Sequence, residues 1–198
     1  MLNFDHAKKR GEGATLMSDF EDDGWSGTVV VFELQGMKLG VKTEVVKRVL
    51  PRVALRLGTE VVPVLEGFLE LRDEWVPVVR LDRLLRLNAG EREVGLSLSL
   101  KGQLMVVRDG ERTLAWGCDG EVSLRKCGAG ELKVLPKDHA LNHAAGWVLD
   151  GVVILEPELL LLEEERVRLK ELGARMEERR SEVMSVGEEG AKDGREGA

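Results

Sequence analysis

Two strand–turn–strand units of the same construction limit what this chain can fold into. The first unit, GFLELRDEWVPVVRL, covers residues 67–81, and the second, GWVLDGVVIL, covers residues 146–155. In both, a glycine opens an apolar strand, a polar turn with an aspartate follows, and a second apolar strand leads into a leucine-rich segment. Two such units predict a doubled architecture. Neither contains an evident nucleophile or metal ligand, which favours a binding scaffold over an enzyme.

The residues around these units also have strand character. Segments 28–34 and 38–50 are rich in β-branched residues, and leucines alternate with serines over 96–100. The dipeptide at 109–110, Asp-Gly between two apolar segments, is typical of a hairpin turn. Many short strands separated by glycine and aspartate turns, with almost no helix between them, predict small barrels or a sandwich.

The composition disfavours several classes of function. The 198 residues carry a formal net charge of −7, which disfavours nonspecific binding to nucleic acid or to an anionic membrane surface. Aromatic residues make up only 4% of the chain, so few rings are available to stack on bases. The first residues lack the apolar core of a signal peptide, and no apolar run is long enough to span a bilayer. We therefore expect a cytoplasmic protein with no nucleic-acid partner and no direct membrane insertion.

Changes in composition divide the chain into a tail, a β domain, a helix and a second tail. The first segment is polar and glycine-containing, and the last is rich in glycine and charge, so both are expected to be disordered. The expected bounds are 1–26 for the flexible N-terminal tail, 27–157 for the β domain, about 27–95 and 96–157 for its two subdomains, 158–184 for the C-terminal helix and 185–198 for the disordered tail.

The helix has a short apolar stripe. Leu162, Leu169, Met176 and Val183 recur every seven residues, although charged residues interrupt the pattern. A stripe of this kind can pack against its own domain, pair with a second copy of the chain, or bind another protein. Packing within the chain is the favoured alternative, and self-association through the helix stays open.

One set of side chains raises the question of a metal. His139 and His143 are four residues apart, which suits one helical face. Cys118 and Cys127 are nine residues apart and lack the short spacing of a zinc knuckle, and Cys118 lies in a strand pattern that predicts a buried thiol. We therefore expect no metal and no cofactor. The chain also lacks a nucleophile elbow, a phosphate-binding loop and a dinucleotide-binding fingerprint, so no enzyme is expected.

Taken together, several of these segments resemble the CheW-like coupling proteins of bacterial chemosensory arrays. Members carry a Pro-x-hydrophobic-x-Gly segment that ends in Asn-Leu-Arg-Gly and is followed by a Val-Pro-Val strand. Residues 63–73, PVLEGFLELRD, and 76–81, VPVVRL, match these two elements in order and spacing. The upstream strands, Asp119 and the closing hairpin at 146–155 fit the family as well, and the similarity spans about residues 28–160.

The resemblance implies both a fold and a function. The fold is all-β, with two interlocked five-stranded SH3-like barrels, a C-terminal α-helix and a disordered N-terminal tail. The function is that of a non-enzymatic adaptor in chemotaxis-type, two-component signal transduction. Its implied partners are the cytoplasmic tip of a chemoreceptor and the regulatory domain of a CheA-like histidine kinase.

Arg72, at the corner of the first hairpin, is the first choice for a partner-binding residue. The resemblance places it at the family's Leu-Arg position, and a guanidinium there can bind a partner's carboxylate in bidentate fashion. The alternative is an ion pair on the protein's own surface, with Glu66, Glu70 or Glu74.

Further partner-binding positions are expected beside that corner in the family pattern. Val45, Val46, Leu65 and Phe68 would form an exposed apolar surface for a partner helix, or would instead belong to the core. Arg48 is included with them because family members often carry an acidic residue there.

The chain departs from the family pattern at several charged positions. Glu70 replaces the usual Asn, Asp73 the usual Gly, Arg80 the usual Asp, and Ala115 another usual Gly. Aspartate tolerates a left-handed turn, so the corner is expected to survive. The changes in charge allow an alternative function, in which the same fold binds a different partner outside receptor arrays through its diverged surface and C-terminal helix.

Overall fold

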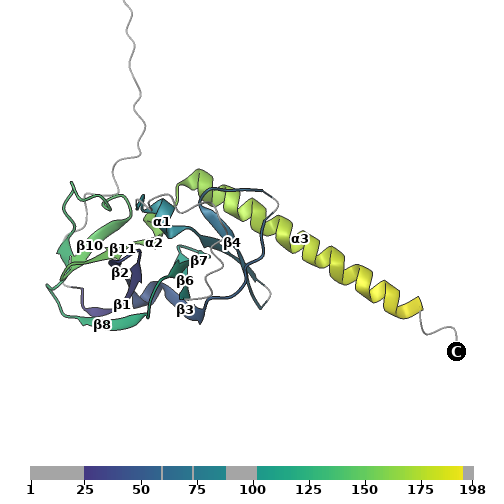
Figure 1. Ribbon diagram of the computed structural model, residues 1–198, viewed down its shortest axis with the longest axis horizontal. Coiled ribbons are helices and arrows are strands. Elements are labelled where there is room, and N and C mark those ends of the chain that lie inside the picture. Colours follow the sequence, from purple (N-terminus) through teal and green to yellow (C-terminus); the bar gives the residue numbers. More distant parts are fainter. Residues whose placement is uncertain (1–24, 59, 73, 88–101, 194–198) are drawn as a thin grey trace, which may run out of the picture.

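A computed structural model describes residues 25–58, 60–72, 74–87 and 102–193, and for residues 182–193 it describes the backbone alone. Two β-sheets lie side by side, and a long helix extends from one of them (Figure 1). Two expectations fall outside the described residues almost entirely: the N-terminal tail and the alternating strand at 96–100.

The first sheet has six strands in the order β8-β1-β2-β11-β10-β9. Its strands are β1 (Gly27–Leu34), β2 (Met37–Lys42), β8 (Ser123–Cys127), β9 (Lys133–Val134), β10 (Ala145–Leu149) and β11 (Val152–Leu155). All neighbours are antiparallel except β11 and β2, which are parallel.

The second sheet has five strands in the order β3-β6-β7-β5-β4. Its strands are β3 (Val46–Pro51), β4 (Leu65–Leu71), β5 (Glu74–Val79), β6 (Gln103–Asp109) and β7 (Arg112–Cys118). Here β5 and β7 are the parallel pair. Both repeated units of the sequence are antiparallel hairpins, β4–β5 and β10–β11, and each joins its sheet through its second strand.

Each sheet takes strands from both halves of the sequence. The hairpin β1–β2 starts the first sheet, but β3 crosses to pair with β6 in the second. In the same way β6–β7 belongs to the second sheet, and β8 crosses back to pair with β1. The expected subdomain bounds of about 27–95 and 96–157 do not match the sheets, because the second sheet is the continuous segment 46–118 and the first is formed by the strands on either side of it. The all-β, interlocked fold is confirmed.

The two sheets pack against each other, so the inner strands are buried on both faces. This explains their continuous apolar composition. On β1, Val29 packs inside the first sheet's own barrel, while Val30 and Phe32 face a central core between the two sheets. On β6, Leu104 lines the second barrel and Met105 faces the central core. The central core holds buried residues of both sheets: Val30, Phe32, Leu34, Leu39, Val41, Val79, Met105, Val107, Leu114, Trp116, Cys118, Val153 and Leu155.

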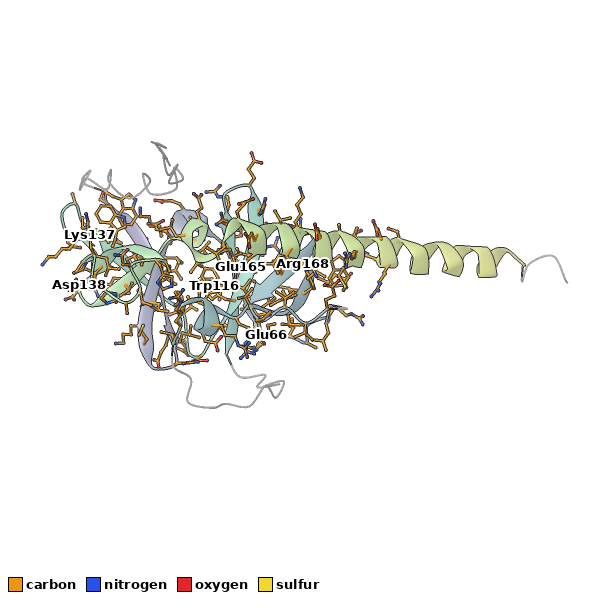
Figure 2. All side chains as sticks on the ribbon, turned by 90° about the horizontal axis from the view of Figure 1, so that it is seen from above. Glu66, Trp116, Lys137, Asp138, Glu165 and Arg168 are labelled. Atoms are coloured by element: carbon orange, nitrogen blue, oxygen red, sulfur yellow. The ribbon has the colours of Figure 1, made fainter. Side chains whose placement is uncertain are left out.

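Trp116 lies where the two sheets meet, near the middle of the molecule (Figure 2). It is fully buried, and its ring centroid is 6.1 Å from that of Phe32 on the first sheet. Aromatic contacts of this kind contribute beyond the area they bury. Trp116 therefore joins the two barrels into one hydrophobic unit.

Short helices follow the second strand of each repeated hairpin. They are α1 (Leu81–Leu84) after β5 and α2 (Pro157–Leu160) after β11, and a 3₁₀ turn, η1 (Thr43–Val45), precedes β3. A long helix, α3 (Glu163–Asp193), completes the described chain.

The C-terminal helix differs from its expected bounds of 158–184. The backbone is extended at Leu161, which lets Leu160 and Leu161 enter the core together, and α3 starts only at Glu163. Leu162 is exposed because it precedes the helix, where its N–H donates to the Glu165 carboxylate at 2.9 Å, as in one half of a capping box. The helix continues to Asp193, so the expected disordered tail from residue 185 is wrong over 185–193.

Replacing Trp116 with alanine is expected to destabilise the whole domain by about 3–5 kcal/mol, because it leaves a cavity in the shared core. Urea unfolding followed by circular dichroism measures the change. Leu124→Ala is the matched control, since Leu124 is 72% exposed and its loss should cost less than about 0.5 kcal/mol. Equal effects of the two substitutions would contradict this role of Trp116.

Candidate partner-binding surface

The corner of the β4–β5 hairpin presents Arg72 to solvent. Leu71 and Glu74 are the last paired residues, so the turn has two central residues, and Arg72 adopts a left-handed backbone with φ of 55°. A positive φ is typical of tight hairpin turns. Asp73, which occupies the family's glycine position, lies outside the described residues.

Two of the three carboxylates that could pair with Arg72 on its own surface form ion pairs with other arginines. Glu66 forms an ion pair with Arg52, and Glu70 lies 3.8 Å from Arg180 on α3. Among the described residues, Arg72 has neither a hydrogen bond nor an ion pair. Its guanidinium is therefore available to a partner.

The expected apolar positions lie away from that corner. Val45 on η1, Val46 at the start of β3 and Leu65 at the start of β4 are half-buried and pack against the central core. Leu65 and Arg72 stand at opposite ends of β4, which puts about 20 Å between them. Arg48 is exposed on β3, which forms one edge of the second sheet. The expected single surface is thus divided in two, and its role in binding stays a prediction.

Phe68 is fully buried, contrary to the exposed position expected from sequence, so a partner can reach it only if an element that covers it moves away. Leu69 faces the interior of the second barrel, so Phe68 faces outward, and two glycines cover it. A methyl group added at Gly58 would lie 3.5 Å from its ring, and one added at Gly173 would lie 3.9 Å away. Gly173 belongs to α3, more than a hundred residues later, and no local pattern in the sequence connects it with Phe68.

Helix α3 packs on the hairpin within the same chain, as the favoured alternative expected. Leu169 and Leu172 are buried, whereas the side chain of Val183 lies outside the described set. Arg168 and Arg175 both bind the carboxylate of Glu60, which lies in the loop between β3 and β4. Figure 1 shows the far end of α3 running beyond the barrels.

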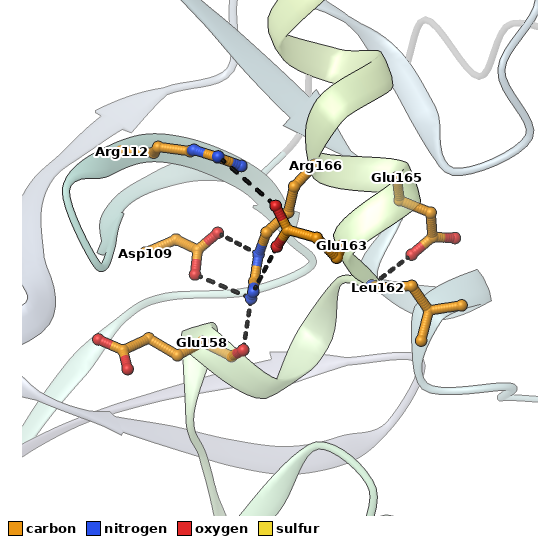
Figure 3. Close-up of polar contacts among 7 residues, drawn as sticks. All are labelled: Asp109, Arg112, Glu158, Leu162, Glu163, Glu165 and Arg166. Carbon is orange, nitrogen blue, oxygen red and sulfur yellow. Dashed lines mark hydrogen bonds and ion pairs between the residues drawn. The ribbon is translucent and has the colours of Figure 1, made fainter. Parts of the chain in front are cut away.

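A buried ion pair attaches the first turns of α3 to the β6–β7 hairpin (Figure 3). Arg166 donates to both carboxylate oxygens of Asp109, at 3.1 and 3.2 Å, and also to the backbone oxygen of Glu158. Burial raises the pKa of Asp109, and the charge of Arg166 acts in the opposite direction. A bidentate pair of this kind is strong and geometrically specific.

The other departures from the family pattern have local structural roles. Arg80 precedes α1 and lies 3.7 Å from Asp82. Ala115 is fully buried inside the second barrel. Asp119, which fits the family pattern, accepts a hydrogen bond from the N–H of Gln35 at 2.6 Å and so ties the β1–β2 turn to the end of β7.

The histidines and cysteines are used in ways that do not resemble a metal site. His139 accepts a hydrogen bond from the N–H of Leu141 at 3.1 Å in a turn, not on the helical face expected from its spacing. His143 contacts the backbone oxygen of Leu84 at 3.1 Å. Burial raises the pKa of Cys118 to about 12, so its thiol stays protonated. Within the part of the chain that the structure describes, no three His, Cys, Asp or Glu side chains form a cluster suited to a metal ion.

The family model for the CheW-like domain matches residues 28–165, which include both sheets and the start of α3. The chain belongs to the CheW-like family. A solved structure with a similar fold is the scaffolding protein TtCheW from Thermoanaerobacter tengcongensis. It is 18% identical, the TM-score is 0.59, and the match covers 69% of this chain and 92% of that one. Among curated proteins, none matches the chain in sequence.

Membership in the CheW-like family confirms the prediction of a non-enzymatic scaffold in chemotaxis-type signalling. The structure adds one point about membranes: none of the helices it describes combines the length and the apolar character needed to cross a bilayer.

Replacing Arg166 with alanine is expected to destabilise this CheW-like chain by about 2 kcal/mol at neutral pH, because it leaves the Asp109 carboxylate buried without its partner. Loss of the nearby positive charge raises the pKa of Asp109 further. The variant therefore binds a proton more readily when folded, and its deficit grows as the pH rises above 3.8, the ordinary pKa of an aspartate.

Urea unfolding of both proteins at several pH values measures this dependence. Arg175→Ala, which removes a half-exposed ion pair, is the control and should cost less than about 1 kcal/mol at every pH. A deficit for Arg166→Ala that stays constant with pH would show that Asp109 does not carry the effect.

Proposed function

We propose that this protein is a cytoplasmic adaptor that couples the tip of a chemoreceptor to the regulatory domain of a CheA-like histidine kinase. Membership in the CheW-like family supports the kind of role. The observation that carries the proposal is Arg72, an exposed guanidinium on a rigid hairpin corner with no partner among the described residues. Such a group contributes binding energy when a partner's carboxylate pairs with it.

The arrangement of the surfaces suits two partners at once. The Arg72 corner stands at one end of β4 and Leu65 at the other, whereas Val45, Val46 and Arg48 belong to η1 and to β3, at the opposite edge of the second sheet. Because about 20 Å separates Arg72 from Leu65, a partner at each end of β4 would not collide with the other. An adaptor of this kind acts by recognition alone and needs no chemical step.

A second candidate function keeps the fold but changes the partner. Glu70, which departs from the family pattern, pairs with Arg180 of α3, so the diverged corner and the C-terminal helix form one surface. A protein outside receptor arrays would bind this combined surface. Co-purification with a CheA-like regulatory domain separates the two functions, since only the first requires it.

Replacing Arg72 with alanine is expected to weaken binding of the kinase regulatory domain or of the receptor tip by about tenfold or more, because a charge-assisted hydrogen bond is lost. The fold should be unaffected, since Arg72 is exposed and forms no hydrogen bond or ion pair with a described residue. Isothermal titration of the purified proteins measures the affinities, and thermal unfolding checks the fold.

Arg86→Ala provides the matched control. Arg86 is also exposed and also has a positive φ, 52° against 55° for Arg72, but it follows α1. Both substitutions keep a Cβ at a positive φ and so leave the backbone strain about the same, and only a specific contact distinguishes them. Unchanged affinity of Arg72→Ala for both partners would defeat the proposal.

A further inference from the structure

Two elements cover one face of the β4–β5 hairpin: the helix α3 and the loop before β4. Cross-strand pairing puts Phe68 opposite Pro77 and Glu70 opposite Trp75, and these four residues form what we call the outer hairpin face. Leu69 and Val76, between them, point into the barrel. The outer hairpin face therefore belongs to the surface of the barrel and is buried only where another element lies on it.

The polar contacts of α3 beyond its first turns are weak. Arg168 and Arg175 bind Glu60 with side chains that are 47% and 49% exposed, and Arg180 reaches Glu70 at 3.8 Å. Ion pairs at such exposure contribute little and are screened by salt. The buried attachments are the pair of Arg166 with Asp109 and the side chains of Leu169 and Leu172, and beyond Leu172 the described part of α3 has no fully buried side chain.

The contact of α3 with the centre of the face is made by a glycine. Phe68 is covered by Gly173, which has no side chain, and a methyl group at that position would still have room 3.9 Å from the ring. The indole N–H of Trp75 is buried without an acceptor among the described residues. A buried donor that lacks an acceptor costs free energy. Helix α3 therefore covers the face but leaves one of its hydrogen-bond donors, the indole N–H of Trp75, without an acceptor among the described residues.

We propose that the outer hairpin face is a helix-binding site that α3 occupies reversibly, and that a helix of a partner protein replaces it. The acidic side chains of Glu60 and Glu70 at the edges of the face select a basic helix. The close approach to Phe68 selects a small residue at its centre. The partner helix thus carries a Gly or Ala flanked by Arg or Lys, placed as Arg168, Arg175 and Arg180 are placed about Gly173. This exchange is independent of the identity of the receptor and of the kinase.

Exchange of α3 would also alter the surroundings of the proposed recognition residue. Arg72 follows β4 directly, and Glu70 at the end of that strand is held by α3. When α3 leaves, Glu70 loses its pairing with Arg180. The corner then presents a free carboxylate beside the Arg72 guanidinium, so a partner with both charges gains a contact.

A labelled peptide with the sequence of residues 163–181 tests the exchange against the full-length chain. In Gly173→Glu, a carboxylate faces Phe68 and the acidic edges of the face, so α3 is displaced while its helix propensity improves. Because the helix in cis competes at high effective concentration, the peptide should bind Gly173→Glu at least about tenfold more tightly than the wild type. Fluorescence anisotropy measures the affinities.

Two variants serve as matched controls. Ala174→Glu adds the same charge to the exposed side of the same turn and should bind the peptide like the wild type. Gly173→Ala adds a methyl group that fits against Phe68 and should bind the peptide no better than the wild type. Equal affinity of Gly173→Glu and the wild type, or equal affinity of Gly173→Glu and Ala174→Glu, would overturn the proposal.

A second substitution tests the same exchange in case Gly173→Glu does not fold. Arg175→Glu reverses an exposed charge and places it against Glu60, so the barrels are unaffected while α3 is repelled. It should also raise the affinity for the peptide, in a manner that disappears at high salt as the charges are screened. No gain in affinity for a folded Arg175→Glu protein would count against the proposal as well.

Discussion

The position of the second sheet, between the two parts of the first, is the constraint on which the rest of the structure depends. The second sheet is one continuous segment, β3 to β7, but the first sheet is built from β1–β2 and β8–β11, which lie on either side of that segment in the chain. Contact between the two sheets buries a second face of the inner strands in a central core, where Trp116 meets Phe32. The barrels thus have one hydrophobic core in common.

A rigid double barrel explains why its ends are suited to recognition. The β4–β5 corner carries Arg72 on a two-residue turn between two paired strands, and β5 is also paired with β7, so the backbone of the corner is held in place. Helix α3 is less firmly fixed. It is anchored at Arg166 and then follows the outer hairpin face through exposed charges. A fixed corner beside a displaceable helix lets the surface change without any change in the fold.

The sequence predicted those features that depend on local pattern or on the family motif. Both repeated hairpins, the turn at residues 109–110 and the buried thiol of Cys118 follow from strand patterns and turn residues. Contacts between distant segments could not be predicted in this way. The burial of Phe68 depends on Gly173, and the pairing of Glu70 depends on Arg180. The helix was predicted to start at residue 158, but α3 starts at Glu163. The carboxylate of Glu165, which interrupts the apolar stripe, accepts a hydrogen bond from the N–H of Leu162 and so caps the N-terminus of α3.

The central claim is that the shared core and the position of the second sheet within the chain of the first make the two barrels a single cooperative unit. Native-state hydrogen exchange of the full-length protein tests it most directly, because it measures the opening free energy of each strand separately. We predict that the slowest amides of β1 and β2 in the first sheet and of β6 and β7 in the second exchange with the same free energy. A sheet whose strands all open at a markedly lower free energy, while the other stays protected, would contradict the account.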